Sequence, residues 1–525
     1  MALPPSASFL AVVLATALFL AAILRRRRRP TRKHKLPPGP RPWPVIGNLN
    51  LIGPLPHRSV HELSKRYGPL MSLRFGSVPV VVGSSVNMAR LILKTHDLAF
   101  IDRPRTASGR YTGFNCSDVL WSPYGAYWRQ ARKLWQTEIF SERQLRLQEH
   151  VRQEEVHAML RGVHDAATAA DGGRRHVVAL RDVLTMANLN VISRMVLGKN
   201  YVVDDGAGSP SPTTPEEFKW MVDEFFVLSG VLNVADFIPW LSWMDPQGYI
   251  KRIKRLAKMF DRFLEHVLDE HNEQRVGKEF VATDMVDLLL KLAEDPNLEV
   301  PIKRDGVKGF TLVIRDLIVG GTDTSTVTTE WAMSELLRNP EVLAKATQEL
   351  DAVVGLNHLV TEGDIPNLPY IKAIVKETMR LHPVTPLLSP RLSREHASMD
   401  GYDIPIGTLV FVNVWAIGRD PVVWGHAAGE FCPERFIGSS IDVKGRDFEL
   451  LPFGSGRRMC PGMGLGLKLV QVNLANLLHG FAWRLPDGVK EELSMEEKYA
   501  LSMPRLVPLE AIAEPKLLAV LYAGP

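Results

Sequence analysis

Hydrophobic residues recur roughly every three to four positions along much of this chain, the spacing that lines one face of an α-helix. We expect helices where this pattern is sustained, at 61–67, 124–136, 249–275, 310–338, 341–354 and 370–381. Proline or glycine ends several of these stretches, as at helix ends generally. Two short runs rich in valine, 78–83 and 410–414, predict β-strands instead. The pattern therefore predicts a mainly α-helical protein with a minor β-sheet.

The start of the chain has a different pattern. Residues 7–24 form an uncharged apolar run, close to the shortest length that spans a bilayer, and five arginines follow at 25–29. A cleavable signal peptide carries its positive charge before the apolar region, whereas here the charge comes after it. We expect a transmembrane signal anchor at 7–24, with everything after Leu24 in the cytosol and the endoplasmic reticulum as the membrane of entry. A buried core helix is the alternative interpretation.

A stiff segment separates this anchor from the body of the protein. Prolines crowd residues 36–44, where they exclude both helix and sheet, so we expect 25–44 to form a basic stop-transfer segment and a proline-rich hinge. No linker, repeat or change of composition divides the chain after Pro44, which predicts one large domain over 45–525. The net charge is +5, but residues 25–35 contribute +8, which leaves −3 for the rest. That balance excludes a nucleic-acid-binding surface.

The sequence FGSGRRMCPG at 453–462 is the first sign of chemistry. Its glycines let the backbone turn sharply around Cys460, and Arg458 supplies positive charge that favours a thiolate. A helix predicted at 465–478 would add its N-terminal dipole. The chain holds only three cysteines, too few for the usual zinc or iron–sulfur sites. A single thiolate indicates haem iron, and a small buried hydrophobic side chain is the alternative.

A second motif lies in the helix predicted at 310–338. Gly320 and Gly321 each cost about 1 kcal/mol in a helix interior, so something needs the space that they leave. Thr324 can donate a hydrogen bond to the carbonyl of Gly320 four residues earlier and open the helix locally. Asp323 beside it is a possible proton source. Ordinary helix packing would explain such a cluster equally well when it stands alone.

Together these motifs resemble those of the cytochrome P-450 family. The loop at 453–462 matches the haem-ligand signature F-x-x-G-x-R-x-C-x-G, and 320–325 matches the oxygen-activation motif A/G-G-x-D/E-T-T/S. Glu377 and Arg380 form an E-x-x-R motif, and PERF follows at 433–436 in the family's order. The proline-rich hinge also matches that of microsomal members of the family. The sequences at 236–240 and 452–458 look most like those of plant microsomal members near the flavonoid-hydroxylase group.

The resemblance assigns roles to individual residues. Cys460 would ligate the iron of haem b, and Thr324 and Asp323 would serve oxygen activation. Glu377, Arg380 and Arg435 would form a buried ionic triad with a structural role. The remaining contacts to haem, including those to its two propionates, would come from these residues: Trp128, Arg132, Gly320, Gly321, Arg391, Phe453 and Arg458.

The resemblance also implies an activity. The enzyme would use O₂ and NADPH-derived electrons to hydroxylate or epoxidise an apolar small molecule of plant specialised or hormone metabolism. No Gly-x-Gly-x-x-Gly fingerprint occurs, so a separate NADPH-cytochrome reductase would deliver the electrons. A haem-thiolate isomerase or dehydratase and a non-catalytic haem-binding membrane protein are the alternatives. The substrate pocket would lie among 103–121, 225–241, 313–324, 384–389 and 501–503, and the sequence does not choose between phenolics, terpenoids and steroids.

Overall fold

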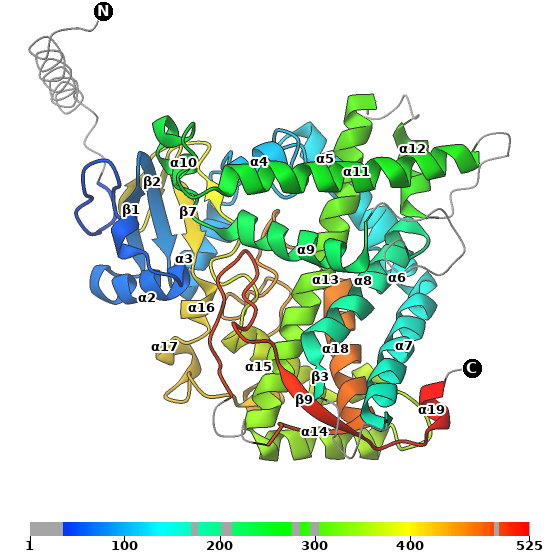
Figure 1. The fold of residues 1–525 in the computed structure, drawn as a ribbon. Coiled ribbons are helices and arrows are strands. Elements are labelled where there is room, and N and C mark those ends of the chain that lie inside the picture. The colour runs from blue at the N-terminus through cyan, green and yellow to red at the C-terminus, as the bar shows by residue number, and fades with distance from the viewer. Residues whose placement is uncertain are drawn as a thin grey trace, which may run out of the picture.

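The computed structural model describes residues 35–169, 177–200, 213–275, 284–293, 304–487 and 493–523. Helices make up most of the molecule, and a small sheet lies to one side (Figure 1). The predicted class, mainly α with minor β-structure, is therefore confirmed. The predicted anchor at 7–24 and the basic run at 25–29 lie outside the described residues. No helix in the described part is long and apolar enough to cross a membrane.

The helices of eight residues or more are α2 (Pro56–Tyr67), α5 (Ala126–Leu134), α7 (Glu149–Thr168), α8 (Leu180–Leu197), α9 (Pro215–Gly230), α11 (Tyr249–Arg275), α12 (Met285–Ala293), α13 (Arg304–Arg338), α14 (Pro340–Val353), α15 (Pro369–Leu381) and α18 (Met463–Gly480). Shorter ones are α3 (Val86–Arg90), α4 (Ala107–Tyr111), α6 (Glu142–Leu147), α10 (Val234–Phe237), α16 (Val414–Ile417), α17 (Pro421–Trp424) and α19 (Val520–Ala523).

Each of the seven helices predicted from the sequence has a counterpart, including the one at 465–478, which corresponds to α18. α11 has the predicted bounds, whereas α2 starts earlier, at Pro56, because proline fits the first turn of a helix. α13 starts at Arg304 instead of 310, and α5 passes at Trp135 into a wider π-helical turn. These differences extend or divide the predicted helices without moving them.

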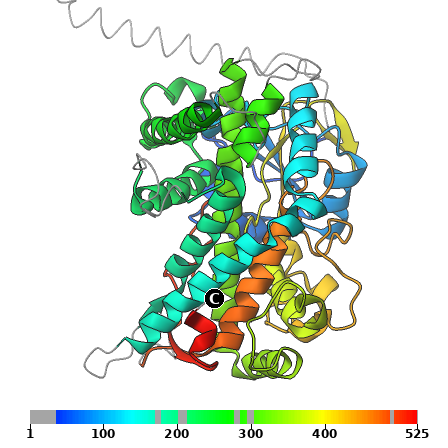
Figure 2. The same ribbon diagram turned by 90° about the vertical axis from the view of Figure 1, so that its right-hand side faces the viewer.

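Helix α13 runs through the interior of the molecule in both ribbon views (Figures 1 and 2). It packs against α8 on one side and α18 on another, and also contacts α15. Side chains along it, such as Trp331 and Leu336, are completely buried. A helix enclosed in this way provides a rigid wall for any site that borders it.

The main sheet has the order β1-β2-β7-β4, with β1 at Leu70–Phe75, β2 at Val78–Gly83, β7 at Leu409–Val412 and β4 at Arg391–Leu392. Smaller sheets join β3 (Val177–Ala179), β9 (Glu510–Pro515) and β8 (Phe481–Arg484), and β5 (Ala397–Met399) with β6 (Tyr402–Ile404).

In the main sheet, β2 has the predicted bounds and pairs in parallel with β7, so that Val80 lies opposite Leu409. β7 ends earlier than predicted because the Asn413 side chain accepts a hydrogen bond from the N–H of Ala416 and starts α16. β4 pairs with β7 and places Arg391 opposite Val410.

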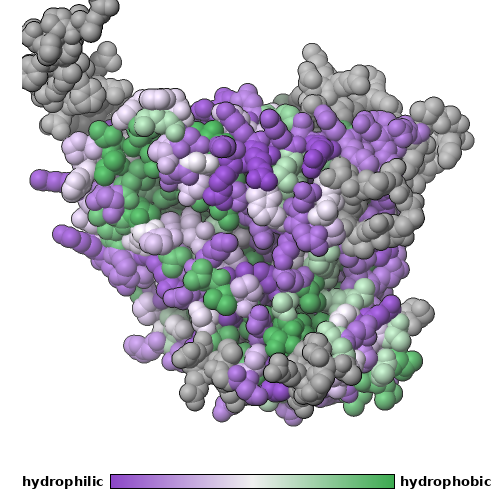
Figure 3. Space-filling view, in the orientation of Figure 1, coloured by the Kyte–Doolittle hydropathy of each residue, from purple (hydrophilic) through white to green (hydrophobic). Residues whose placement is uncertain are grey.

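The described part of the proline-rich hinge lies along the outer strand of this sheet. The N–H of Ser72 in β1 donates to the carbonyl of Pro38 at 2.8 Å, and the Ser72 hydroxyl donates to that of Pro37 at 2.7 Å. The space-filling view shows hydrophobic surface over β1 and β2 on the same side as this segment (Figure 3). Trp43, which is 64% exposed, belongs to the hinge. Hydrophobic surface therefore lies close to the N-terminal end of the described chain.

Candidate active site

One cavity brings together most of the residues singled out in the sequence. It lies between α13, the loop before α18, and α5. Asp323 does not line it, but the other predicted catalytic residue and all of the predicted haem contacts do: Trp128, Arg132, Gly320, Gly321, Thr324, Arg391, Phe453, Arg458 and Cys460. These residues come from segments far apart in the chain, so their convergence depends on the tertiary fold.

The loop that carries Cys460 depends on glycine at two positions. Gly454 and Gly456 have φ angles of +69° and +72°, which other residues rarely adopt. A Cβ atom on Gly456 would also lie 2.3 Å from the carbonyl oxygen of Leu93. The Cys460 N–H donates to the carbonyl of Phe453 at 2.9 Å and closes the loop, and α18 starts just beyond it. The thiol is accessible because it faces the cavity, although protein surrounds it on the other sides.

The electrostatics of this thiol differ from the sequence-based expectation. Burial raises the pKa of Cys460, and the N–H of Gly462 and the charge of Arg132 lower it only in part. Arg458, the residue expected to favour the thiolate, instead donates to the carbonyls of Ile101 at 3.0 Å and Ser122 at 2.7 Å. The protein alone therefore favours the neutral thiol, and a bound metal ion would provide the charge that deprotonates it.

Four arginines line the cavity with few anions to balance them. The charged groups belong to Arg103, Arg132, Arg391 and Arg458, and among these four only Arg391 forms an ion pair with a described residue, with Asp97 at 3.1 Å. Burial and, to a smaller extent, the charge of Arg391 lower the pKa of Arg458 to about 9. Burial also lowers the pKa of Arg103, Arg132 and Arg391. Such a group of buried cations fits a ligand that brings its own acidic groups.

The indole of Trp128 does not have the free N–H that the family resemblance implied for a propionate contact. Its indole N–H donates to the carbonyl of Val119 at 3.1 Å, so another partner already uses the donor expected to face a propionate. The ring instead lies under Arg458, whose guanidinium carbon is 4.4 Å from the ring centroid. Arg132, one helical turn away, has no hydrogen-bond or ion-pair partner among the described residues, and only the charge of Cys460 acts on it. Of the two, Arg132 remains available to an anion.

The two adjacent glycines of α13 have different surroundings. A Cβ atom on Gly320 would meet nothing within 4 Å, because this position opens onto the cavity. A Cβ atom on Gly321 would lie 2.6 Å from the side chain of Ile192 in α8. Gly320 therefore leaves room for a flat ligand beside the helix, whereas Gly321, which also borders the cavity, lets α8 and α13 approach closely. Together with Cys460 and the arginines, this room fits a haem.

Thr324 and Asp323 point in different directions from α13. The Thr324 hydroxyl donates to the carbonyl of Gly320 at 2.8 Å, the bond expected from the sequence, and α13 remains α-helical through this turn. Asp323 lies beside Ser502, away from the cavity. The pKa of Asp323 is raised to about 7, mainly by burial, with the hydrogen bond to Ser502 acting to lower it and the charge of Asp223 acting to raise it. Asp323 can therefore hold a proton near neutral pH.

The predicted ionic triad is present as a set of contacts. Glu377 accepts two hydrogen bonds from Arg380, at 2.7 and 2.8 Å, and one from Arg435 at 2.9 Å. Glu377 and Arg380 are 0% and 1% exposed. Arg380 also donates to the carbonyls of Ala428 and Glu430. These bonds fasten α15 to the segment that leads to the cysteine loop.

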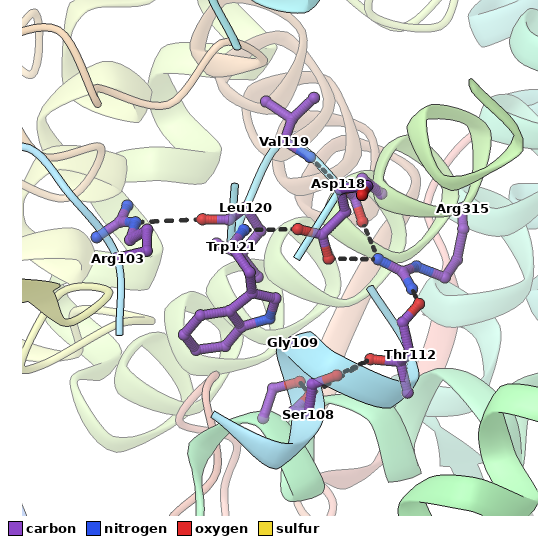
Figure 4. Close-up of polar contacts among 12 residues, drawn as sticks. Arg103, Ser108, Gly109, Thr112, Asp118, Val119, Leu120, Trp121 and Arg315 are labelled. Carbon is purple, nitrogen blue, oxygen red and sulfur yellow. Dashed lines mark hydrogen bonds and ion pairs between the residues drawn. The ribbon is translucent and has the colours of Figure 1, made fainter. Parts of the chain in front are cut away.

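A second buried ionic cluster was not predicted from the sequence. Figure 4 shows the guanidinium of Arg315 in α13 directed at the carboxylate of Asp118 and the carbonyl of Thr112. The Arg315 nitrogen Nη2 lies 2.9 Å from Asp118 and 2.5 Å from Asp316. Asp316 in turn accepts a hydrogen bond from the N–H of Val119 at 3.1 Å. The adjacent charged residues Arg315 and Asp316, inside an otherwise apolar part of α13, were the sequence signal that could have indicated this cluster.

Arg315 therefore binds the loop around 112–119 to α13 at the edge of the cavity, which both Val119 and Asp316 line. Burial and, to a smaller extent, the charge of Asp316 raise the pKa of Asp118 to about 7. Arg103, also overlooked as an individual residue, holds the same region by donating to the carbonyls of Leu120 at 3.2 Å and Ser389 at 2.7 Å.

The chain is similar to known proteins over almost its whole length. The family model for cytochrome P450 matches residues 37–508. Trimethyltridecatetraene synthase of Zea mays is 49% identical, with 98% of this chain and 95% of the relative covered. Flavonoid 3'-monooxygenase of Petunia hybrida is 43% identical, with 98% and 99% covered. A solved structure of a zebra fish cytochrome P450 with abiraterone superposes with a TM-score of 0.71 at 24% identity, covering 88% of this chain and 100% of that one.

Proposed function

The chain belongs to the cytochrome P450 family and is a monooxygenase of plant specialised metabolism, and from this premise we propose that it hydroxylates or epoxidises an apolar small molecule. The family's cofactor is a haem held by a cysteine thiolate. One observation supports the proposal above the others. Cys460 and the Gly320–Thr324 turn border the same cavity, together with four arginines of which three lack a carboxylate partner among the described residues.

In this proposal the cavity holds haem b. Cys460 is the iron ligand, and no other cluster of metal-binding side chains lies around it in the described chain. Arg132, Arg391 and Arg458 neutralise the two propionates, assisted by Arg103. A haem ligated by thiolate supplies an electron-rich iron that favours cleavage of the O–O bond. Phe453 and Gly320 border the remaining space for the ring.

Thr324 and Asp323 of α13 deliver protons to the oxygen site. Overall, O₂, two electrons and two protons give one oxygen atom to the substrate and one molecule of water. We assign to the Thr324 hydroxyl the positioning of a proton at the oxygen site, because it faces the cavity while its own hydrogen is directed to the carbonyl of Gly320. Asp323, buried behind it, stores the proton and passes it on through water or a movement of its side chain.

Electron supply and location follow from the same proposal. The electrons come from NADPH through a separate cytochrome reductase. The segment 7–24 anchors the protein in the endoplasmic reticulum membrane, 25–44 forms the stop-transfer and hinge segment, and 45–525 is the cytosolic catalytic domain. The hydrophobic surface near the hinge supports this arrangement, because it lies close to the N-terminal end of the described chain (Figure 3).

Reconstitution tests the proposed function. The full chain in lipid vesicles, with a plant NADPH-cytochrome reductase, is incubated with panels of phenolics, terpenoids and steroids. We expect at least one compound to shift the haem absorption band and to yield a product that contains one oxygen atom from ¹⁸O₂, with NADPH consumed. A product that forms without O₂ and NADPH, by rearrangement or dehydration, would contradict the proposal.

A further inference from the structure

Asp316 occupies a distinctive place in the cavity wall. Among the described residues that line the cavity it is the only carboxylate. Asp316, Gly320 and Thr324 are four residues apart, so they share a face of α13, with Asp316 about 6 Å from Gly320 and about 12 Å from Thr324 along the helix axis. The side chain is only 6% exposed. A carboxylate in this position borders the cavity and is shielded from bulk solvent.

Two contacts fix this carboxylate whether or not a ligand is present. Its Oδ1 atom is 2.5 Å from Nη2 of Arg315, and its Oδ2 atom accepts from the N–H of Val119 at 3.1 Å. Each carboxylate oxygen can accept two hydrogen bonds, so Asp316 retains capacity for a further donor. The neighbouring cavity wall is apolar and includes Leu317, Phe225 and Leu501. In these surroundings the missing donor has to come from water or from the ligand.

The charges around Asp316 favour a neutral donor over a cationic one. Arg315 is shared between Asp118 and Asp316, so its single positive charge does not belong to Asp316 alone, and the ionised Asp316 remains a strong hydrogen-bond acceptor. An ammonium group would lose its hydration on entering the cavity and would approach the guanidinium of Arg315. A hydrocarbon would leave the remaining acceptor capacity of Asp316 without a donor. A hydroxyl group avoids both penalties.

We propose that Asp316 determines specificity by accepting a hydrogen bond from a hydroxyl group of the substrate, so that the preferred substrates are apolar alcohols or phenols. This proposal rests on the proposed function, since it concerns ligands of the same cavity. Arg315 acts as a positioning residue, because it holds Asp316 and the 112–119 loop without lining the cavity itself.

Binding of matched ligand pairs to the haem-loaded full chain tests the proposal. Farnesol is compared with farnesyl methyl ether, and 4-phenylphenol with 4-methoxybiphenyl, by titration of the haem absorption band. A hydrogen bond to a charged acceptor predicts that the wild type binds the hydroxyl compound of at least one pair about 10- to 100-fold more tightly than its ether. Asp316→Leu should abolish this preference, and Asp316→Asn, which keeps the shape, should reduce it.

Asp118→Asn is the matched control, because Asp118 contacts the same arginine but does not line the cavity. It should change the affinities for alcohol and ether by similar factors and leave their ratio intact. Equal binding of alcohol and ether by the wild type, binding of no hydroxyl compound, or an unchanged ratio in Asp316→Leu would each overturn the proposal. So would tighter binding of farnesylamine than of farnesol without a nitrogen–iron spectrum. A wild type that lacks the haem-thiolate spectrum would instead contradict the proposed function.

Discussion

Cys460 faces the cavity with a thiol that the protein does not ionise by itself. If this residue is the iron ligand, Cys460→Ser should lose the thiolate-type absorption of the reduced carbon monoxide complex, because a serine oxygen does not reproduce the electron donation of sulfur. Cys116→Ser and Cys432→Ser should retain it. A Cys460→Ser protein with an unchanged spectrum would show that the ligand lies elsewhere.

Thr324 and Asp323 should fail in different ways when they are replaced. Thr324→Ala leaves the haem site and the carboxyl group of Asp323 unchanged, but it removes the Thr324 hydroxyl that faces the cavity. We expect it to bind haem and substrate and to consume NADPH, while product falls and hydrogen peroxide rises. The measurement is the ratio of product to NADPH, with Thr328→Ala as a control one turn further along the helix. An unchanged ratio would leave Thr324 with a packing role only.

The raised pKa of Asp323 gives its variant a characteristic pH dependence. In the folded protein this carboxyl keeps its proton up to about pH 7, whereas its ordinary pKa is 3.8. Proton donation by Asp323 is therefore available below about pH 7 and is lost as pH rises through that value. Wild-type turnover should fall over this range, and Asp323→Asn should be slower by about 10²- to 10⁴-fold with little pH dependence. A variant whose rate falls through pH 7 as in the wild type would assign that titration to another group.

At the level of elements, the cysteine loop offers a matched pair of substitutions. Gly454→Ala and Gly456→Ala both place a side chain at positive φ, at about 1–2 kcal/mol each. Only the Cβ atom of Gly456→Ala also meets a backbone oxygen, at 2.3 Å, whereas at position 454 the nearest atom is 3.8 Å away. Gly456→Ala should therefore lower haem content per protein and the melting temperature more than Gly454→Ala does. The reverse order would mean that the loop can move away from Leu93.

The observed elements show which features of the fold can be predicted from the sequence. Periodicity located α11 and β2 with their observed bounds, because each carries an uninterrupted pattern. It misplaced the end of β7, where the side chain of Asn413 ends the strand by capping a helix. Local motifs located Cys460 and Thr324, but not the Asp118–Arg315 pair, whose members are 197 positions apart and meet only in the tertiary fold. Likewise, the indole N–H of Trp128 is bound to Val119, a contact that helical spacing does not reveal.

For the molecule as a whole, the proposed anchor makes a prediction about topology. The full chain should resist carbonate extraction from endoplasmic reticulum membranes, because an apolar helix in the bilayer is not released by high pH. Protease added from the cytosolic side should digest the domain after Pro44, and its protection in sealed vesicles would contradict the proposed orientation. A protein without residues 1–35 should retain weak binding to vesicles through exposed side chains such as Trp43 and Trp243, which are 64% and 81% exposed.

The parallel pairing of β2 with β7 also constrains how the protein is made. Val80 has its strand partner at Leu409, 329 positions later, so the main sheet stays incomplete while the intervening chain is translated. At roughly 5–20 residues per second, the β1–β2 hairpin waits on the order of tens of seconds with an unpaired edge. The cysteine loop leaves the ribosome later still. Sheet closure and cofactor uptake therefore both belong to the last stage of synthesis, and the early hairpin is the part of the nascent chain that most needs protection from aggregation.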